Sequence, residues 1–149
     1  MTSTNTKTYS ADEVSLSIAG YTIDSGFADG EFVSIEMASD DFSDKVGADG
    51  EVARAKTNDR RATIKIKLLQ TSQGNDLLSG LRTLDINGPN GAGVGAFLLR
   101  DRSGLMVAQA GKCWISKAPT VARGREIVEY EWTLRASSMN LVVAGNTAI

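Results

Sequence analysis

The sequence has no histidine and a single cysteine, and these absences remove most catalytic and metal-binding chemistry. Without histidine, Ser-His and Cys-His nucleophile pairs and imidazole metal sites are excluded. An enzyme that depends on lysine or carboxylate side chains remains possible, but an enzyme is not expected. Cys113 has no partner for an intramolecular disulfide, which favours a reducing compartment.

Long hydrophobic runs and an excess of positive charge are also missing. No apolar stretch approaches the roughly 18 residues that cross a membrane, and the first residues lack the apolar region of a signal peptide. The 16 Lys and Arg side chains are balanced by 18 Asp and Glu, giving a net charge of −2. That balance argues against a strongly basic nucleic-acid-binding protein. We therefore expect a soluble protein, made in the cytoplasm, without a membrane partner.

The length of 149 residues suits one domain, and a domain of this size buries roughly 70% of its unfolded surface. Fifteen glycines and two prolines favour turns and short strands over long helices. Residues 1–10 are polar and predict a flexible N-terminal arm. We expect a single domain over residues 1–149, with residues 137–149 as a C-terminal tail.

Alternation of apolar and polar residues predicts most of the chain to be β-strand. The expected strands cover residues 14–18, 32–37, 52–56, 61–69, 96–100, 105–116 and 128–136. The segments 96–100 and 105–116 form a predicted hairpin around the turn at 101–104. In the segment 61–69 the apolar side chains face one way and the charged ones the other.

One helix is expected. Four leucines recur there at helical spacing: Leu77, Leu78, Leu81 and Leu84. They predict a helix near residues 76–84, which Thr71 or Ser72 can cap and which the sequence at 87–89 ends. Strands, one helix and strands again indicate a mainly β protein, an antiparallel β-sandwich or barrel with one packed α-helix.

Residues 39–50 break the hydrophobic pattern with four aspartates and two glycines, and Phe42 and Val46 lie among them. The carboxylates do not have the spacing of an EF-hand calcium loop. We therefore predict a solvated or interface loop rather than a metal site, and favour contact with a neighbouring subunit because apolar side chains gain little in a free loop. The candidate interface residues are Asp40, Phe42, Asp44, Val46, Asp49 and Glu51.

Two other polar patterns invite sharper interpretations. The glycine-rich segment 88–95 lacks the Gly-Lys-Ser/Thr ending of a phosphate-binding loop, so a mobile connection is favoured. Arg60, Arg61, Lys65 and Lys67 form the one basic stripe. This stripe is either a solvated strand face or a surface that pairs with an acidic face of a neighbouring copy.

Glu129 and Glu131 lie two residues apart and alternate with aromatic residues on one predicted strand. Glycosidases take their two carboxylates from opposite sides of a cleft, so an exposed strand face is the expected interpretation. Burial of Tyr130 and Trp132 forces both glutamates to the water-facing side. Trp114 is expected in the core with them, because no Lys/Arg-lined groove surrounds these aromatics in sequence.

Several segments in order resemble a known family. They are ADEVSLSIAG at 11–20, GFADGEFVSIE at 26–36, FSDKVGADGEVARAKTND at 42–59 and KIKLLQTSQGNDLLSGL at 65–81. Together they are similar to the bacteriophage tail tube family over roughly two-thirds of the chain. The last third is similar more loosely, through a final strand ending EWTLRA.

The resemblance implies a structural subunit that forms hexameric rings, stacked into a hollow tube inside a contractile sheath. It also implies a fold similar to the type VI secretion tube protein, no cofactor, and a place in the virion tail after assembly in the bacterial host cytoplasm. The expected partners are further copies of itself, sheath, baseplate and tail terminator proteins. Double-stranded DNA would pass without tight binding.

A bore that does not hold phosphate calls for an acidic or neutral lining, and Glu129 and Glu131 are the candidates for it. The sequence does not choose between the bore and the sheath-facing exterior for the side that carries them; sheath binding through charge would favour the exterior. Two alternatives stay open at this point. One is the secreted tube protein of a type VI-like contractile injection system, and the other is a ligand-binding β-sandwich module. An enzyme ranks behind both.

Overall fold

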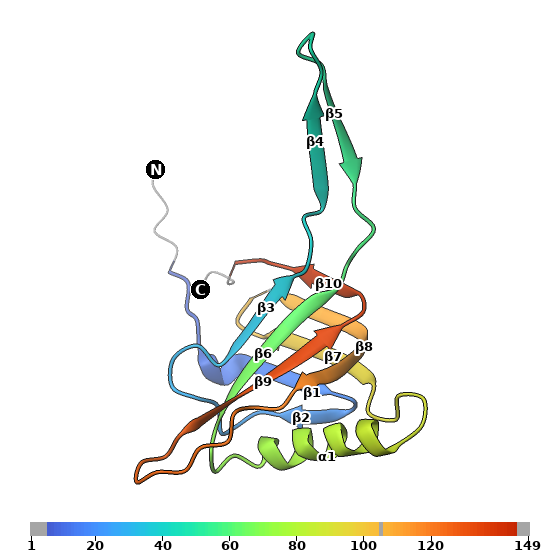
Figure 1. Ribbon diagram of the computed structural model, residues 1–149. Coiled ribbons are helices and arrows are strands. Elements are labelled where there is room, and N and C mark those ends of the chain that lie inside the picture. The colour runs from blue at the N-terminus through green and yellow to red at the C-terminus, as the bar shows by residue number, and fades with distance from the viewer. Residues whose placement is uncertain (1–5, 105, 146–149) are drawn as a thin grey trace.

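A computed structural model describes residues 6–104 and 106–145 and shows a folded sheet, one α-helix and a separate hairpin (Figure 1). The helical elements are η1 (Ala11–Glu13) and α1 (Gly74–Asn87). The strands are β1 (Val14–Ile18), β2 (Tyr21–Ile23), β3 (Val33–Met37), β4 (Phe42–Val46), β5 (Val52–Lys56), β6 (Ala62–Leu69), β7 (Gly95–Asp101), β8 (Val107–Lys117), β9 (Glu129–Ala136) and β10 (Met139–Val142).

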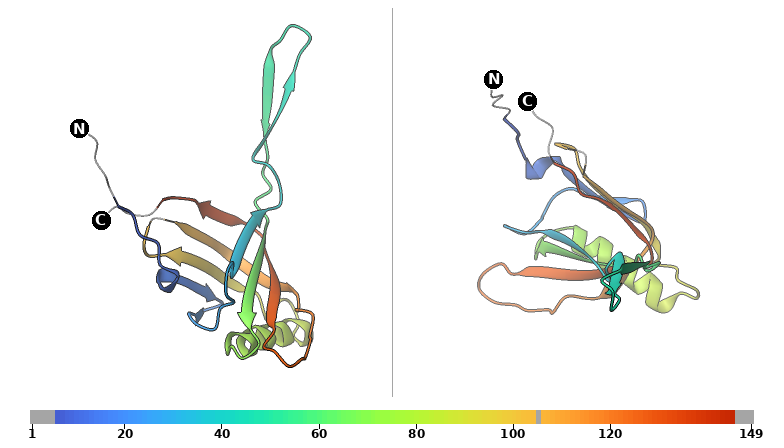
Figure 2. Two further views of the ribbon diagram at one scale, coloured as in Figure 1. Left: turned by 90° about the vertical axis from the view of Figure 1, so that its left-hand side faces the viewer. Right: turned by 90° about the horizontal axis from the view of Figure 1, so that it is seen from above.

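The main sheet is antiparallel and folds back on itself. Its order is β2-β1-β7-β8-β9-β6-β3, and β10 also pairs with β8. β10 pairs with the first half of β8 and β9 with the second half, so both lie on the same side of that strand. Figure 2, seen from above, shows the resulting two layers, with β3, β6 and β9 in one and the strands around β7 in the other. The predicted antiparallel β-sandwich is confirmed.

The core lies between these two layers. Ala62, Ile64, Ile66 and Leu68 of β6 are all at 0% exposure, whereas Lys65 between them is exposed. The alternation of apolar and polar residues along β6 therefore corresponds to burial of one face of the strand, as the sequence predicted. Helix α1 covers one end of the sandwich, with its buried leucines Leu78 and Leu81.

Helix α1 is longer than predicted and begins differently. It extends beyond both ends of the expected segment 76–84 but ends before Gly88-Pro89, as expected. The N-cap is Gln73, without a side-chain cap, so capping by Thr71 or Ser72 is wrong in position. The Ser72 hydroxyl instead accepts a hydrogen bond from the Gly74 amide at 3.1 Å. Leu84, expected on the apolar stripe, is 56% exposed.

Two short strands of the main sheet were not predicted. β2 and β10 each have few residues, and pairing with a neighbour rather than their own pattern holds them in place. β10 lies inside the expected tail at 137–149, so that prediction is wrong for residues 139–142. Tyr130 and Trp132 are buried as expected, but Trp114 is only half-buried, since the adjacent Cys113 occupies the core-facing side of β8.

Residues 1–5 of the expected N-terminal arm and residues 146–149 of the expected tail lie outside the described residues. Residues 6–9 of the arm are exposed, and its flexibility stays a prediction. In the part of the chain that the structure describes, no helix has the length and apolar character needed to cross a membrane.

Candidate assembly interface

The segment between β3 and β6 leaves the sandwich as a hairpin (Figure 1). β4 and β5 pair only with each other, in the register Phe42↔Lys56 to Val46↔Val52. The prediction of a loop at 39–50 is therefore wrong for residues 42–46, which form a strand. β4 is held by backbone hydrogen bonds to β5, which place no demand on its side chains. Because neither face of β4 is buried, its sequence lacks the alternation of apolar and polar residues that predicts a strand.

The hairpin has no core of its own. Every residue from 40 to 56 is exposed, including Phe42 at 46%, Val46 at 64% and Val52 at 63%. An isolated two-stranded hairpin is at best marginally stable in water. Exposed apolar side chains on such an element are typical of a surface that packs against another molecule.

The two faces of the hairpin differ, because residues directly opposite each other share a face. One face carries three cross-strand pairs: Phe42 with Lys56, Asp44 with Arg54, and Val46 with Val52. On this face the Arg54 guanidinium lies 4.3 Å from the centre of the Phe42 ring, a cation–π contact. The other face carries two cross-strand pairs, Ser43 with Ala55 and Lys45 with Ala53, and three of these four side chains are small. We call the first of these the aromatic face of the hairpin.

The turn at the tip is closed by its own hydrogen bonds. The Gly47 amide donates to the Glu51 carbonyl at 2.7 Å, and the Glu51 amide donates to Asp49 Oδ1 at 3.2 Å. Gly50 has a φ of +88°, a left-handed conformation that favours glycine. Asp49 thus shapes the turn and also adds negative charge to it.

The neck between the hairpin and the sandwich is tied by polar contacts. Asp59 accepts hydrogen bonds from the Ser39 hydroxyl at 2.9 Å and from Arg61 Nη2 at 2.9 Å. The Arg61 hydrogen bonds hold the pKa of Asp59 well below its usual range, and Ser39 lowers it further. In the neck, the Thr57 amide donates to the Asp41 carbonyl at 2.8 Å. The hairpin therefore leaves the body through a braced neck rather than a loose connection.

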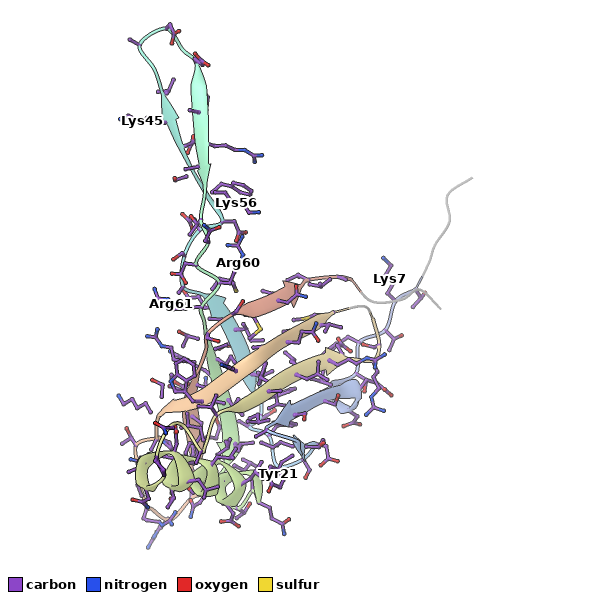
Figure 3. The ribbon with its side chains drawn as sticks, turned by 90° about the vertical axis from the view of Figure 1, so that its right-hand side faces the viewer. Lys7, Tyr21, Lys45, Lys56, Arg60 and Arg61 are labelled. Atoms are coloured by element: carbon purple, nitrogen blue, oxygen red, sulfur yellow. The ribbon has the colours of Figure 1, made fainter. Side chains whose placement is uncertain are left out.

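Basic side chains gather along this neck. Figure 3 shows Lys56, Arg60 and Arg61 following one another from the hairpin down to the sandwich. Arg60 Nη1 lies 3.6 Å from Asp41 Oδ1 and donates to the Thr57 carbonyl at 2.8 Å. Most of this positive charge is therefore already paired within the chain.

All six predicted interface residues belong to the neck and hairpin. Asp40 lies in the neck, whereas Phe42, Asp44 and Val46 share the aromatic face, and Asp49 and Glu51 lie at the tip. Sequence reasoning missed Val52 and Arg54 on the same face. The two valines of the segment VGADGEV, on either side of a Gly-containing turn, are the signal that could have revealed this pairing.

The predicted lumen residues Glu129 and Glu131 are exposed on the outer face of β9, as expected. Lys67 pairs directly with Glu131 in the β6–β9 register, and their charged groups lie 3.8 Å apart. Lys65 Nζ lies 4.0 Å from the same carboxylate. Lys65 and Lys67 of the basic stripe therefore share one face of mixed charge with Glu131, and these three side chains face the same side of any assembly.

A groove of about 340 Å³ opens between the layers near β3 and β7. It is the place where a small molecule would bind if the chain were a ligand-binding β-sandwich module. Its lining is apolar apart from a few groups, among them Glu31 and Asp101. The Asp101 carboxylate already accepts hydrogen bonds from the Ser103 amide and hydroxyl. Among the described residues, no group of three or more His, Cys, Asp or Glu is placed to hold a metal ion.

Comparison with known proteins identifies the family. The family described as "Bacteriophage PhiTE tail tube protein" matches residues 6–144. The chain belongs to this phage tail tube family. Structural protein ORF10 of Pseudomonas phage KPP10 is 25% identical over 150 residues, covering 97% of this chain and 86% of that protein. This tail tube protein is thus a structural component of a phage virion, and its family is not one of enzymes.

A solved structure shares the fold. The tube-terminating cap of the anti-feeding prophage, determined by cryo-EM, superposes with a TM-score of 0.60 over 97% of each chain. The sequence identity is 10%, so the likeness concerns the fold alone. It agrees with the tail-tube-like sandwich predicted from the sequence.

Proposed function

We propose that this tail tube protein forms hexameric rings that stack into the inner tube of a contractile phage tail, the channel through which DNA is ejected. The β4–β5 hairpin carries the proposal. It exposes both of its faces, it lacks a core of its own, and a braced neck holds it away from the body. Packing against a neighbouring subunit supplies the missing partner surface, with Phe42 and Val46 as the apolar contacts.

Ring closure is proposed to use the edges of the main sheet. Its order ends at β2 on one side and at β3 on the other, so each subunit offers an edge at each of these two strands. An exposed edge presents unpaired backbone groups, and continuing the sheet into the next subunit satisfies them. A closed ring of such contacts uses different surfaces on the two partners, which is a heterologous interface.

The bore is proposed to be acidic or neutral, with Glu129 and Glu131 facing it. The pairing of Lys65 and Lys67 with Glu131 supports a face of low net charge, which forms few counterion-releasing contacts with phosphate. Reversing both glutamates to lysine is expected to make assembled tubes bind double-stranded DNA in a salt-dependent manner. The same reversal at Asp24 and Asp29 is the control, and equal DNA binding by both variants would contradict the lumen assignment.

Electron microscopy of the purified protein tests the assembly. We expect hollow rings or tubes with six-fold symmetry. A variant that replaces residues 42–56 by Asn-Gly between Asp41 and Thr57 keeps the neck contact and is expected to fold but not to stack. A wild-type protein that stays monomeric at high concentration, even with tail-initiating components present, would refute the proposal.

A second candidate is a tube or tube-end protein of a contractile injection system, since the tube-terminating cap of such a system has the same fold. A cap ends a tube, so it is expected to remain a single ring. A tube subunit is expected to stack into structures of many rings. The length distribution of particles in the same micrographs separates the two candidates.

A further inference from the structure

The hairpin and the β8–β9 connection (residues 118–128, with Lys117 at the adjoining end of β8) lie at opposite ends of the molecule. Figures 1 and 2 show the hairpin rising from one end, whereas the connection and α1 reach the other end of the sandwich. If a second copy is stacked beyond the hairpin tip in the same orientation, the end of that copy that carries the β8–β9 connection faces the hairpin tip of the first copy. Such a contact joins two different surfaces, and a repeated heterologous contact produces an open stack.

The hairpin tip and the segment 117–127 carry opposite charge. The segment from Asp40 to Glu51 holds five carboxylates and a single lysine, Lys45. The segment from Lys117 to residue 127 holds three basic side chains and one glutamate: Lys117, Arg123, Arg125 and Glu126. Opposite charge on two surfaces steers them together and disfavours contact between two copies of the same end.

Both ends also expose aliphatic side chains. At the hairpin tip, Val46 and Val52 form a cross-strand pair and are 64% and 63% exposed. On the connection, Val121 is 73% and Ile127 64% exposed. Contact between these pairs would remove apolar surface from water at both ends, which is favourable in proportion to the area buried.

The other basic surfaces near β6 are already engaged within the chain. Arg61 pairs with Asp59, and both Lys65 and Lys67 lie within 4.0 Å of Glu131. In the residues that the structure describes, no ion pair joins Lys117 or Arg125. Arg123 is oriented by its hydrogen bond to the Tyr130 hydroxyl, which anchors the connection to β9.

We infer that the β8–β9 connection of one subunit receives the hairpin tip of the next subunit in the stack, through Lys117 and Arg125 against the tip carboxylates and Val121 and Ile127 against Val46 and Val52. The inference rests on the proposed stacking and names the surface that the hairpin contacts. A stack built from such junctions has free hairpin tips at one end and free connections at the other, so the two ends of the growing tube differ. Stacking is also expected to weaken with rising salt.

Cross-linking between two single-cysteine variants tests the inference. Glu51→Cys protein is assembled with Arg125→Cys protein and treated with a short bismaleimide. A covalent dimer is expected only in the mixture, because neither variant places two new cysteines at one junction. Cys113 is 1% exposed and stays out of the reaction. Glu51→Cys mixed with Arg82→Cys on α1, or with Gln109→Cys on β8, is the control and is expected to give little dimer.

The outcomes separate the two proposals. If tubes form but Glu51→Cys links to position 82 or 109, or to none of the three positions, stacking stands and the connection is not the receiving surface. If the wild-type protein forms no stacks, both proposals fail. Dimer with position 125 alone supports both.

Charge exchange supplies an independent readout on assembled material. Glu51→Lys and Arg125→Glu are each expected to reduce the sedimenting fraction at low salt, and the double variant is expected to restore it. A double variant that assembles no better than the two single variants would overturn the pairing of the tip with the connection.

Discussion

β6 and β4 belong to the same chain and are both antiparallel strands, yet β6 buries one of its faces and β4 buries neither. In β6 every second side chain is fully buried, whereas in β4 all five are exposed even though Phe42 and Val46 are apolar. The first strand finds its partner surface inside its own subunit. The second has none there, and we propose that its apolar residues contact another molecule. On this proposal, the sandwich supplies the stability of the subunit and the hairpin supplies its assembly contacts.

The most direct test of this difference between the two strands is to truncate a buried residue of the sandwich. Ile66→Ala removes a side chain at 0% exposure and is expected to lower the free energy of unfolding by about 2–5 kcal/mol. Val52→Ala, an aliphatic truncation on the exposed hairpin, is the matched control and is expected to change it by less than about 0.5 kcal/mol. Urea unfolding of both variants measures the contrast, and similar values would mean that the buried face is misassigned.

The contact between α1 and the sheet is the next largest effect. Asn75 accepts a hydrogen bond from Trp132 Nε1 at 2.9 Å and donates to the Leu69 carbonyl at 2.9 Å. Asn75→Ala leaves the buried indole N–H without this partner, and we expect a loss of about 1–3 kcal/mol. Ser79→Ala on the exposed side of α1 is the control. Equal urea midpoints for the two variants would show that water replaces the Asn75 contact.

Phe42→Ala sharpens the comparison from the other side. Phe42 is 46% exposed, so its truncation is expected to change the unfolding free energy by less than about 0.5 kcal/mol. Assembly, measured by sedimentation and microscopy, is expected to be impaired because the aromatic face loses its largest apolar side chain. Leu84→Ala, at a similarly exposed position on α1, is the control. Normal tubes from the Phe42 variant would indicate that the hairpin is only solvated.

The difference between the regions also explains what the sequence predicted. Strands such as β6 and β9 were predicted because burial of one face imposes an alternating pattern. β4 buries no face within this subunit, so its sequence lacks this alternating pattern, and it was mistaken for a loop. β2 and β10 are short, and their pairing with β1 and β8 depends on tertiary register. Sequence alternation alone also could not choose which of Cys113 and Trp114 faces the core.

The sequence marked the segment that forms the neck and hairpin but not the arrangement of its side chains, and its role as an interface stays a prediction. The apolar residues among carboxylates marked the segment, and all six predicted residues lie in it. That Val52 and Arg54 share a face with Val46 and Phe42 depends on the hairpin register. The sharing of one face by Lys67 and Glu131 likewise depends on the β6–β9 pairing, which joins residues far apart in sequence.

The smallest expected effect concerns the thiol of Cys113, which reports the body alone. Burial raises the pKa of Cys113 from 9.0 to about 12, so the neutral thiol persists at pH 8 and reaction with a disulfide reagent is expected only after unfolding. Because the folded-state pKa is the higher one, the associated stabilisation is complete below pH 9 and declines as the pH rises toward 12. In a Glu51→Cys variant, the new hairpin thiol is expected to react at once under the same native conditions. Rapid native labelling of Cys113 as well would show that the body opens locally, contrary to the division drawn between the two regions.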